Sequence, residues 1–190
     1  MTFPIAMRAT LQDQACDGSD GQRPRFLGMT RRVSVIVGIL VAASCSGLEH
    51  SRQAADEASA LASLRAILSA QMAFSTACGA GGFAPSLKEL AMPPKQGGEA
   101  FLSPDLKSDP TVKSRYVISI SPGPMASDLP ESCNGLAAGR TTKSFFVTAA
   151  PAQPGGRFFA ANAEAIIYES TVPIPVTLSG RPPAPAVEIK

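Results

Sequence analysis

Cysteine is the residue type with the clearest chemical use in this 190-residue chain, and it occurs at positions 16, 45, 78 and 133. Cys78 and Cys133 both lie in glycine-containing, turn-like stretches, ACGAGG and ESCNGLA, beyond the most apolar segment. In an exported protein, such a pair favours a disulfide, whereas a zinc site needs clustered ligands at short spacing. Because the only histidine is His50, we expect a Cys78–Cys133 disulfide and no metal site.

The residue types that enzymes use for catalysis form no recognisable motif in this chain. Any Ser-His-Asp or Cys-His arrangement would depend on His50, which lies in a polar stretch, and no Gly-x-Ser-x-Gly motif is present. The glycines of ACGAGG lead into FAPS and predict no phosphate loop. Two acidic pairs, Asp56 with Glu57 and Asp105 with Asp109, are expected to be solvated surface charges. The sequence predicts no enzyme and no cofactor.

The cysteine at position 45 ends an apolar segment, SVIVGILVAASCSG, that has the layout of an export signal. The basic residues of MTRR, which begins at Met29, precede a short apolar run and then small residues. A helix of this length spans about 20 Å, short of the roughly 30 Å hydrocarbon core of a bilayer. Small residues at positions 42–44 also fit lipid attachment to Cys45, although the expected aliphatic position holds alanine. Residues 29–47 are therefore a signal or membrane-anchor segment that is cleaved, lipidated or retained.

The positive charge of the chain is concentrated before this apolar segment. Residues 1–32 carry five arginines and three aspartates, and the remainder balances twelve basic against twelve acidic side chains. A balanced remainder offers no electrostatic footprint for nucleic acid, so no nucleic-acid partner is expected. Residues 1–28 are polar and lack periodicity, which indicates a disordered extension or a start assigned too early, with translation beginning at Met29 rather than Met1.

A long amphipathic helix is predicted over residues 48–77, where no proline or glycine interrupts the chain. Its apolar positions recur at steps of three and four residues, which is the period of one helix face. This stripe consists of Leu61, Leu64, Leu68 and Met72, widened by Ile67 and Phe74. Polar residues, Glu57 and Gln71 among them, are expected mainly on the other faces. The stripe packs in the core and is also a candidate assembly surface.

Short strands are expected after the helix and a Pro/Gly-rich connection. Runs rich in β-branched and aromatic residues lie at 115–121, 143–150, 157–163 and 165–170, and the last two are close enough for a hairpin around 162–164. This order predicts an α+β fold, with one long helix followed by a small antiparallel sheet at about 115–170. The domain then spans residues 48–170, and the Pro-rich residues 171–190 form an extended tail.

The order of several short blocks resembles type IV pilins and type II secretion pseudopilins. These blocks are Glu57–Ala60 and Ser63–Arg65 in the helix, GFAPSL at Gly82–Leu87, then RYVISISP, CNG and SFFVTAAPAQPGGRFFAANAEAIIYE. The resemblance covers roughly Val35 to Glu169. It implies a structural subunit without a catalytic site, whose apolar N-terminal helix lies in the inner membrane before assembly and in the filament core afterwards. Its head faces the periplasm, and its partners are other pilin-like subunits.

The N-terminal end departs from that family. The glycine-ended motif cut by prepilin peptidases is missing, together with its glutamate, and Arg31 and Arg32 stand where the membrane helix should be, at a cost of a few kcal/mol. Two functions therefore remain open. One is a subunit or accessory of a type IV pilus or type II secretion apparatus. The other is an exported lipoprotein or periplasmic binding or adaptor module that does not polymerise. Both place the protein in the bacterial envelope, held through residues 33–45 or a lipid on Cys45, or exported.

Overall fold

The computed structural model describes the backbone of residues 31–189 and the side chains of residues 48–189. Two compact units are present, Met1–Arg52 and Gln53–Lys190, and we call the second unit the head. The only described element of the first unit is the beginning of helix α1 (Arg31–Ala77), which continues into the head. The predictions for residues 1–28, for the side chains of the apolar segment and for lipidation of Cys45 lie outside the described residues.

Within the described part of the chain, no helix combines the length and the apolar content that a bilayer span requires.

The head contains a single six-stranded antiparallel sheet, and each strand pairs with the next strand along the chain. The strands are β1 (Thr111–Lys113), β2 (Tyr116–Pro122), β3 (Phe145–Pro151), β4 (Phe158–Asn162), β5 (Ile167–Ser170) and β6 (Val187–Ile189). Alternating burial in β2, with Tyr116, Ile118 and Ile120 buried, shows that this strand has an inner and an outer face. The predicted α+β fold, a long helix followed by an antiparallel sheet, is confirmed.

The sheet has two more strands than the sequence indicated. β2, β3, β4 and β5 lie within the four predicted runs to within a residue, and β4 and β5 form the predicted hairpin. β1 and β6 were missed because each has three residues, too few for a period to be visible. The expected extended tail is corrected: its end pairs with β5, with Ile189 opposite Ile167.

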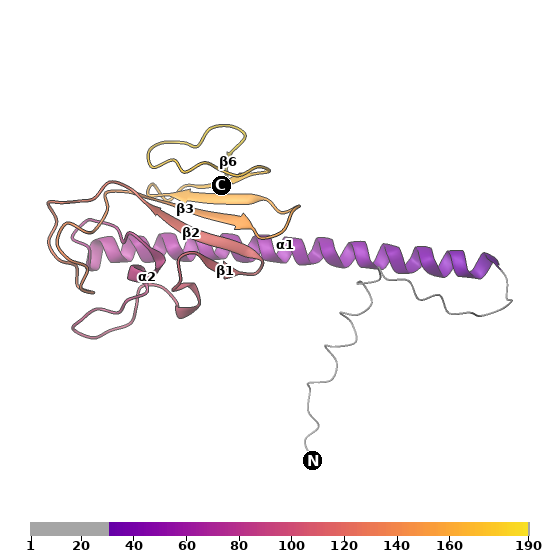
Figure 1. Cartoon of the computed structure of the whole chain (residues 1–190), viewed down its shortest axis with the longest axis horizontal. Coiled ribbons are helices and arrows are strands. Elements are labelled where there is room, and N and C mark those ends of the chain that lie inside the picture. The colour runs from indigo at the N-terminus through magenta and orange to yellow at the C-terminus, as the bar shows by residue number, and fades with distance from the viewer. Residues whose placement is uncertain (1–30, 190) are drawn as a thin grey trace, which may run out of the picture. The chain divides into compact units, whose positions relative to one another are not determined.

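Helix α1 packs against the inner face of the sheet (Figure 1). Leu64, Ile67 and Phe74 from the helix join Ile118 and Phe159 from the sheet in one hydrophobic core. Two positions correct the predicted helix face. Met72 is 45% exposed, and Gln71 is fully buried.

The buried helix face follows a regular series of steps. Its central line consists of Glu57, Ala60, Leu64, Ile67, Gln71, Phe74 and Cys78, spaced alternately by three and four residues. Beside this line, Ser63, Leu68, Ala70 and Ser75 are also buried. This spacing keeps one stripe of a helix on one side, and Met72 falls one position beyond it. The stripe therefore includes two polar residues, which must find partners inside the head.

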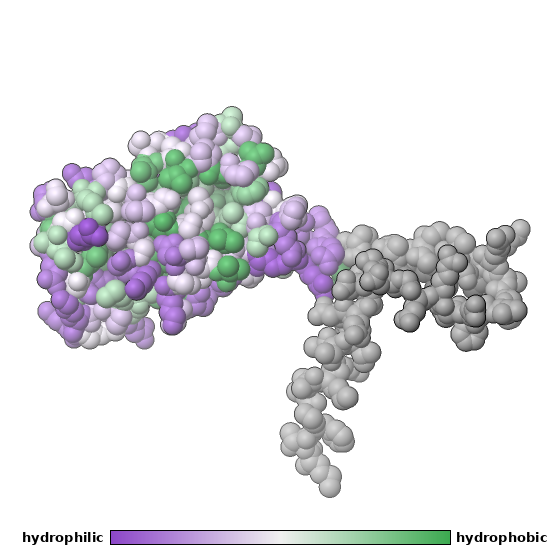
Figure 2. All heavy atoms as spheres, in the orientation of Figure 1, coloured by the Kyte–Doolittle hydropathy of each residue, from purple (hydrophilic) through white to green (hydrophobic). Residues whose placement is uncertain are grey.

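The outer face of the sheet is covered by the last part of the chain. Phe146, Ala160 and Tyr168 from the sheet pack with Ile174 and Ala186 in a second, smaller core. On the face drawn in Figure 2, hydrophobic residues reach the surface between hydrophilic ones. The head is therefore a three-layer structure of helix, sheet and C-terminal segment.

The connection between helix and sheet is anchored by a second, short helix, α2 (Leu87–Leu90). Ser86 caps its N-terminus: its hydroxyl accepts a hydrogen bond from the Glu89 amide at 3.4 Å and donates to the Glu89 carboxylate. Ser86 is therefore a side-chain N-cap of α2, and the Glu89 carboxylate binds the hydroxyl of this cap. A 3-10 turn, η3 (Pro104–Leu106), follows and buries Leu106.

Candidate functional site

The predicted disulfide joins Cys78, beyond the last turn of α1, to Cys133 in the long loop between β2 and β3. The two Cα atoms are 4.8 Å apart, and the Cys133 amide also donates a hydrogen bond to the Cys78 carbonyl at 3.2 Å. The amide of Lys95 in turn donates to the Cys133 carbonyl at 2.9 Å. The disulfide is therefore confirmed, and it fixes three segments that are far apart in the sequence.

Gln71, on the buried stripe of α1, forms hydrogen bonds with a buried backbone segment in the way that a neighbouring strand would. Its Nε2 donates to the Ala84 carbonyl at 2.8 Å, and its Oε1 accepts from the Ala84 amide at 2.9 Å. Both residues are fully buried. A side-chain amide offers a donor and an acceptor together, as a neighbouring strand would. Gln71 thereby satisfies two backbone groups that would otherwise be buried without a hydrogen bond.

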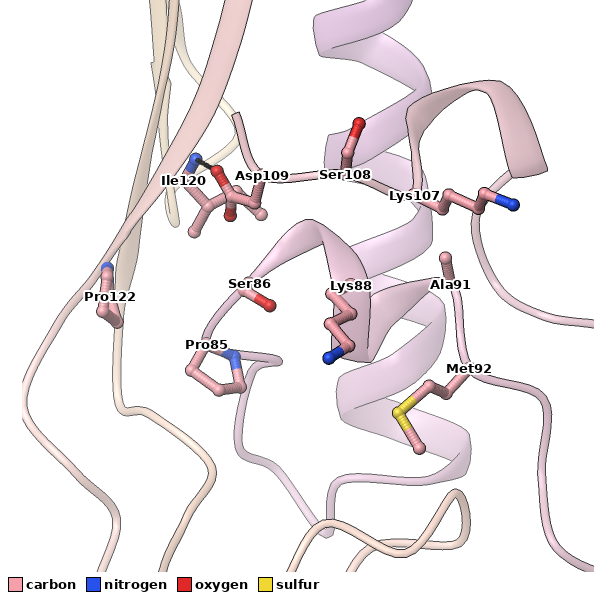
Figure 3. A pocket seen from close by; sticks show the side chains of 10 residues that line it. All are labelled: Pro85, Ser86, Lys88, Ala91, Met92, Lys107, Ser108, Asp109, Ile120 and Pro122. Atoms are coloured by element: carbon pink, nitrogen blue, oxygen red, sulfur yellow. Dashed lines mark hydrogen bonds between the residues drawn. The ribbon is translucent and has the colours of Figure 1, made fainter. Parts of the chain in front are cut away.

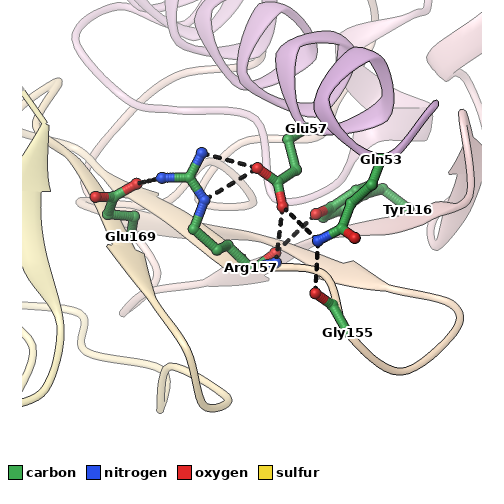
Figure 4. Close-up of polar contacts among 6 residues, drawn as sticks. All are labelled: Gln53, Glu57, Tyr116, Gly155, Arg157 and Glu169. Atoms are coloured by element: carbon green, nitrogen blue, oxygen red, sulfur yellow. Dashed lines mark hydrogen bonds and ion pairs between the residues drawn. The ribbon is translucent and has the colours of Figure 1, made fainter. Parts of the chain in front are cut away.

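A polar cluster lies at the other end of the buried stripe, around Glu57 and Arg157 (Figure 4). Arg157 lies just before β4 and binds the Glu57 carboxylate with its Nε and Nη2 at 3.0 and 2.8 Å, while its backbone amide donates to the other oxygen at 3.2 Å. Its Nη1 binds Glu169 of β5 at 2.5 Å. One guanidinium therefore connects α1, the β3–β4 loop and β5.

The carboxylate of Glu57 is held in its charged form. Burial by itself raises the pKa of Glu57, but hydrogen bonds from the side chain of Arg157, from Gln53 and from the backbone of Arg157 outweigh that effect and lower it. The hydrogen bonds to Glu57 correspondingly raise the pKa of Arg157. Burial, assisted by the charge of Glu57, raises the pKa of Tyr116 to about 12. Each group keeps its usual charge at neutral pH.

Further contacts tie the β1–β2 turn and the β3–β4 loop to the same end of the helix. The Tyr116 hydroxyl donates to the Arg157 carbonyl at 2.8 Å, and Gln53 donates to the Gly155 carbonyl at 2.6 Å. Asp56, one residue before Glu57, forms an ion pair with Arg115 at 2.6 Å. The cluster is thus a polar clamp between helix and sheet, and we call it the ionic clamp.

The ionic clamp is arranged for holding rather than for catalysis. Both oxygens of Glu57 accept hydrogen bonds, from Gln53 and Arg157, so neither has a lone pair directed at a substrate site. A general base needs access to a substrate proton and a pKa near the working pH, and the lowered pKa of Glu57 is unsuited to that role. The geometry supports a structural function for these charges.

Of the two acidic pairs that were expected to be solvated surface charges, only some members are exposed. Asp105 is exposed and pairs with Lys113 at 2.6 Å, as a surface charge would. Glu57 was predicted wrongly, since it is buried and bound by Gln53 and by Arg157 of the β3–β4 loop. Asp109 also differs, because its two oxygens accept from the backbone amides of Leu87 and Ile120.

Other residues considered for chemistry or assembly form no common site. His50 is exposed, and no cluster of metal-binding side chains is found among the described residues. Of the candidate assembly residues, Leu64 and Leu68 are buried in the core and Leu61 packs against it. Only Met72 has a largely exposed side chain. Leu64 and Leu68 are therefore already used within the head.

Sequence reasoning missed Glu57, Gln71 and Arg157 as partners. For the first two a signal was present, because both continue the alternating series of buried positions on α1. For Arg157 no local signal exists, since its partner lies 100 residues away in the sequence.

In comparisons with protein-family models, curated proteins and solved structures, no match to this chain was found.

Proposed function

We propose that this chain is a non-enzymatic, pilin-like structural protein of the bacterial envelope, which contacts other subunits through the part of α1 that precedes the head. The observation that carries the proposal is the unequal use of one helix. α1 begins at Arg31, yet its first buried side chain among residues 48–77 is Glu57. Residues 48–52 are all exposed, and Leu48 is 49% exposed. The head therefore uses only the later part of α1 for its own core.

The disulfide is consistent with this proposal. Disulfides persist in oxidising compartments such as the bacterial periplasm, and are rare in the cytosol. The bond between Cys78 and Cys133 joins segments that are 55 residues apart in the sequence. It supports export of the head, which both a filament subunit and a periplasmic module require.

Photo-cross-linking in the native host tests the filament proposal. Benzoylphenylalanine is introduced at Leu48, on the exposed part of α1, and in a second strain at Val112, which is 68% exposed on β1. We expect irradiation at Leu48 to give a ladder of covalent multimers with itself or with other pilin-like subunits. The Val112 position is the control for random collision. Only monomer from the Leu48 position, with unchanged pili and secretion after deletion of the gene, would refute assembly.

The second candidate, an exported lipoprotein or adaptor module, is favoured by Arg31 and Arg32 before the apolar segment and by the small residues before Cys45. Metabolic labelling with a fatty-acid precursor distinguishes it, using wild type and the Cys45→Ser variant. Label that disappears in Cys45→Ser supports the lipoprotein. Equal or absent label in both strains excludes it.

A further inference from the structure

A groove on the head lies between α2 and the end of β2, with the segment Lys107–Asp109 along one side (Figure 3). Its volume is about 870 Å³, which lies within the range of ligand-binding clefts. Its walls are mainly apolar and come from Pro85, Ala91, Met92, Ile120 and Pro122. Met92 is 39% exposed, so apolar surface is accessible at this groove.

One wall of the groove is an unpaired strand edge. β1 pairs with β2 only from Tyr116 to Ile118, and the rest of β2 has no partner strand on that side. The Ile120 amide points to this side, since it donates to Asp109 Oδ1 at 3.3 Å. The amide and carbonyl of one strand residue point the same way, so the Ile120 carbonyl also faces this side. Pro122 has no amide hydrogen, and this stretch of edge therefore presents mainly acceptors.

Among the charged side chains around the groove, two lysines have no carboxylate partner in the described range. Asp109 accepts from the backbone amides of Leu87 and Ile120, and Ser86 is engaged with Glu89. Lys88 and Lys107 are exposed, and neither forms an ion pair with any residue of the described range 48–189. In Figure 3, Lys88 extends between Pro85 and Met92, and Lys107 lies at the other end, beyond Ala91.

We propose that this groove binds an extended, acidic peptide segment of a protein partner. Backbone amides of the peptide donate to the open edge of β2, as in β-strand addition. Its apolar side chains lie on Met92 and Pro122, and its carboxylates pair with Lys88 and Lys107. The inference does not rest on filament assembly, because a subunit and a periplasmic module could both carry such a site.

The strand edge favours a peptide over a fatty-acyl chain. An acyl chain has no hydrogen-bond donor for the carbonyl of Ile120, so this acceptor would have no partner in the ligand. A peptide supplies donors on one edge and exposes its other edge to water, which suits an open groove. The apolar walls and the two lysines by themselves would suit either ligand, so the test includes both.

The test measures fluorescence anisotropy of labelled peptides with the purified full chain. The probe is a hexapeptide that alternates valine and glutamate, and the matched peptides carry glutamine or lysine in place of glutamate. We expect the glutamate peptide to bind most tightly. Reversing both lysines, in Lys88→Glu with Lys107→Glu, should weaken it roughly tenfold or more and should favour the lysine peptide instead.

Two further variants keep the result interpretable. Lys143→Glu changes an exposed lysine outside the groove and should leave binding within about twofold of wild type. Met92→Glu, on the apolar wall, should weaken the glutamate peptide without unfolding the head, since Met92 is exposed. Equal binding of the glutamate and glutamine peptides, or no effect of the lysine reversal, would overturn the proposal. If dodecanoate binds in a way that depends on the two lysines, and no peptide binds, the groove would be assigned to a lipid. That outcome would also overturn the proposal.

Discussion

The two ends of the buried helix stripe are held to the rest of the head in different ways. At the C-terminal end, Cys78 is covalently bonded to Cys133 and Gln71 is hydrogen-bonded to buried backbone. At the N-terminal end, the ionic clamp holds Glu57 through the half-exposed guanidinium of Arg157. A covalent bond and neutral hydrogen bonds are insensitive to mild acid and salt, whereas ion pairs depend on both.

The two kinds of contact differ in how easily each end of the stripe can separate from the sheet. Ion pairs that are partly exposed contribute little and vary with conditions, and a disulfide acts mainly by restricting the unfolded chain. The end of the stripe nearest the exposed residues 48–52 is therefore the adjustable one. The distal end, with its loops crosslinked, is fixed. Four variants, each with a control, and one pH series separate these contributions.

The largest effect is expected from removing the disulfide. The double variant Cys78→Ala with Cys133→Ala releases a loop defined by a separation of 55 residues. Chain-entropy arguments give a loss of about 4 kcal/mol in the free energy of unfolding for a loop of this size. Urea denaturation of wild type with and without reductant should show the same loss. A change below about 1 kcal/mol would mean that the fixed end does not depend on this bond.

Replacing Gln71 by leucine comes next in size. Gln71→Leu fits the apolar stripe but leaves the amide and carbonyl of Ala84 buried without partners. Each unsatisfied buried group costs about 1–3 kcal/mol, and burial of the leucine side chain offsets part of the sum, so we expect a loss of about 2–4 kcal/mol in unfolding free energy. The control is Met72→Leu, at the next position of the helix, where the side chain is exposed. We expect this variant to lose less than about 0.5 kcal/mol in unfolding free energy. Equal effects at the two positions would contradict the assigned helix face.

The ionic clamp should respond less strongly. Arg157→Leu removes the cation from the Glu57 carboxylate and from the ring of Phe159, whose centroid lies 5.6 Å from the guanidinium carbon. Because Arg157 is about half exposed, water can replace part of its interaction, and we expect a loss of about 2 kcal/mol on denaturation. Lys113→Leu, in an exposed pair with Asp105, should cost less than about 1 kcal/mol. A loss at Arg157 larger than that of the disulfide variant would reverse the ranking of the two ends.

Acid should loosen the ionic end alone. The folded pKa of Glu57 is lowered from its ordinary value of 4.5, so its contribution is fully present above that pH and is lost as the pH falls through the folded pKa. The difference in unfolding free energy between wild type and Glu57→Gln should therefore shrink between pH 7 and pH 3. The difference between wild type and the double cysteine variant should stay constant over the same range. If the unfolding free energies of wild type and Glu57→Gln changed with pH in parallel, the ionic end of the stripe would be no more sensitive to acid than the disulfide end.

The smallest effect is a gain at the fixed end. Thr141 is fully buried next to Gly82, and its hydroxyl has no hydrogen-bond partner among the described residues. Thr141→Val keeps the shape and removes the unsatisfied oxygen, and it should stabilise the head by about 1 kcal/mol in thermal or urea unfolding. The neighbouring Thr142 hydroxyl donates to the Phe83 carbonyl at 3.4 Å, so Thr142→Val should bring no gain. Stabilisation by Thr142→Val but not by Thr141→Val would disprove this assignment.

Much of the fold could be predicted from the sequence because it depends on local patterns. The long helix has no proline or glycine between Leu48 and Ala77, and β2 to β5 are apolar runs bounded by turn residues. The strands that were missed, β1 and β6, owe their pairing to neighbours rather than to their own composition. The Pro-rich end returns to the sheet because Ile174 and Ala186 find apolar surface on its outer face.

The order of helix and sheet and the pairing of Cys78 with Cys133 could be inferred from the amino-acid sequence, and so could the three- and four-residue period of the helix, but not every position that the helix buries. These follow from periodicity, composition and turn residues, all of which are local. The burial of Glu57 and Gln71, in contrast, depends on contacts that form when the head folds. A polar side chain can be buried only when its partners are in place, and those partners, Arg157 and the backbone of Ala84, reach it through the fold.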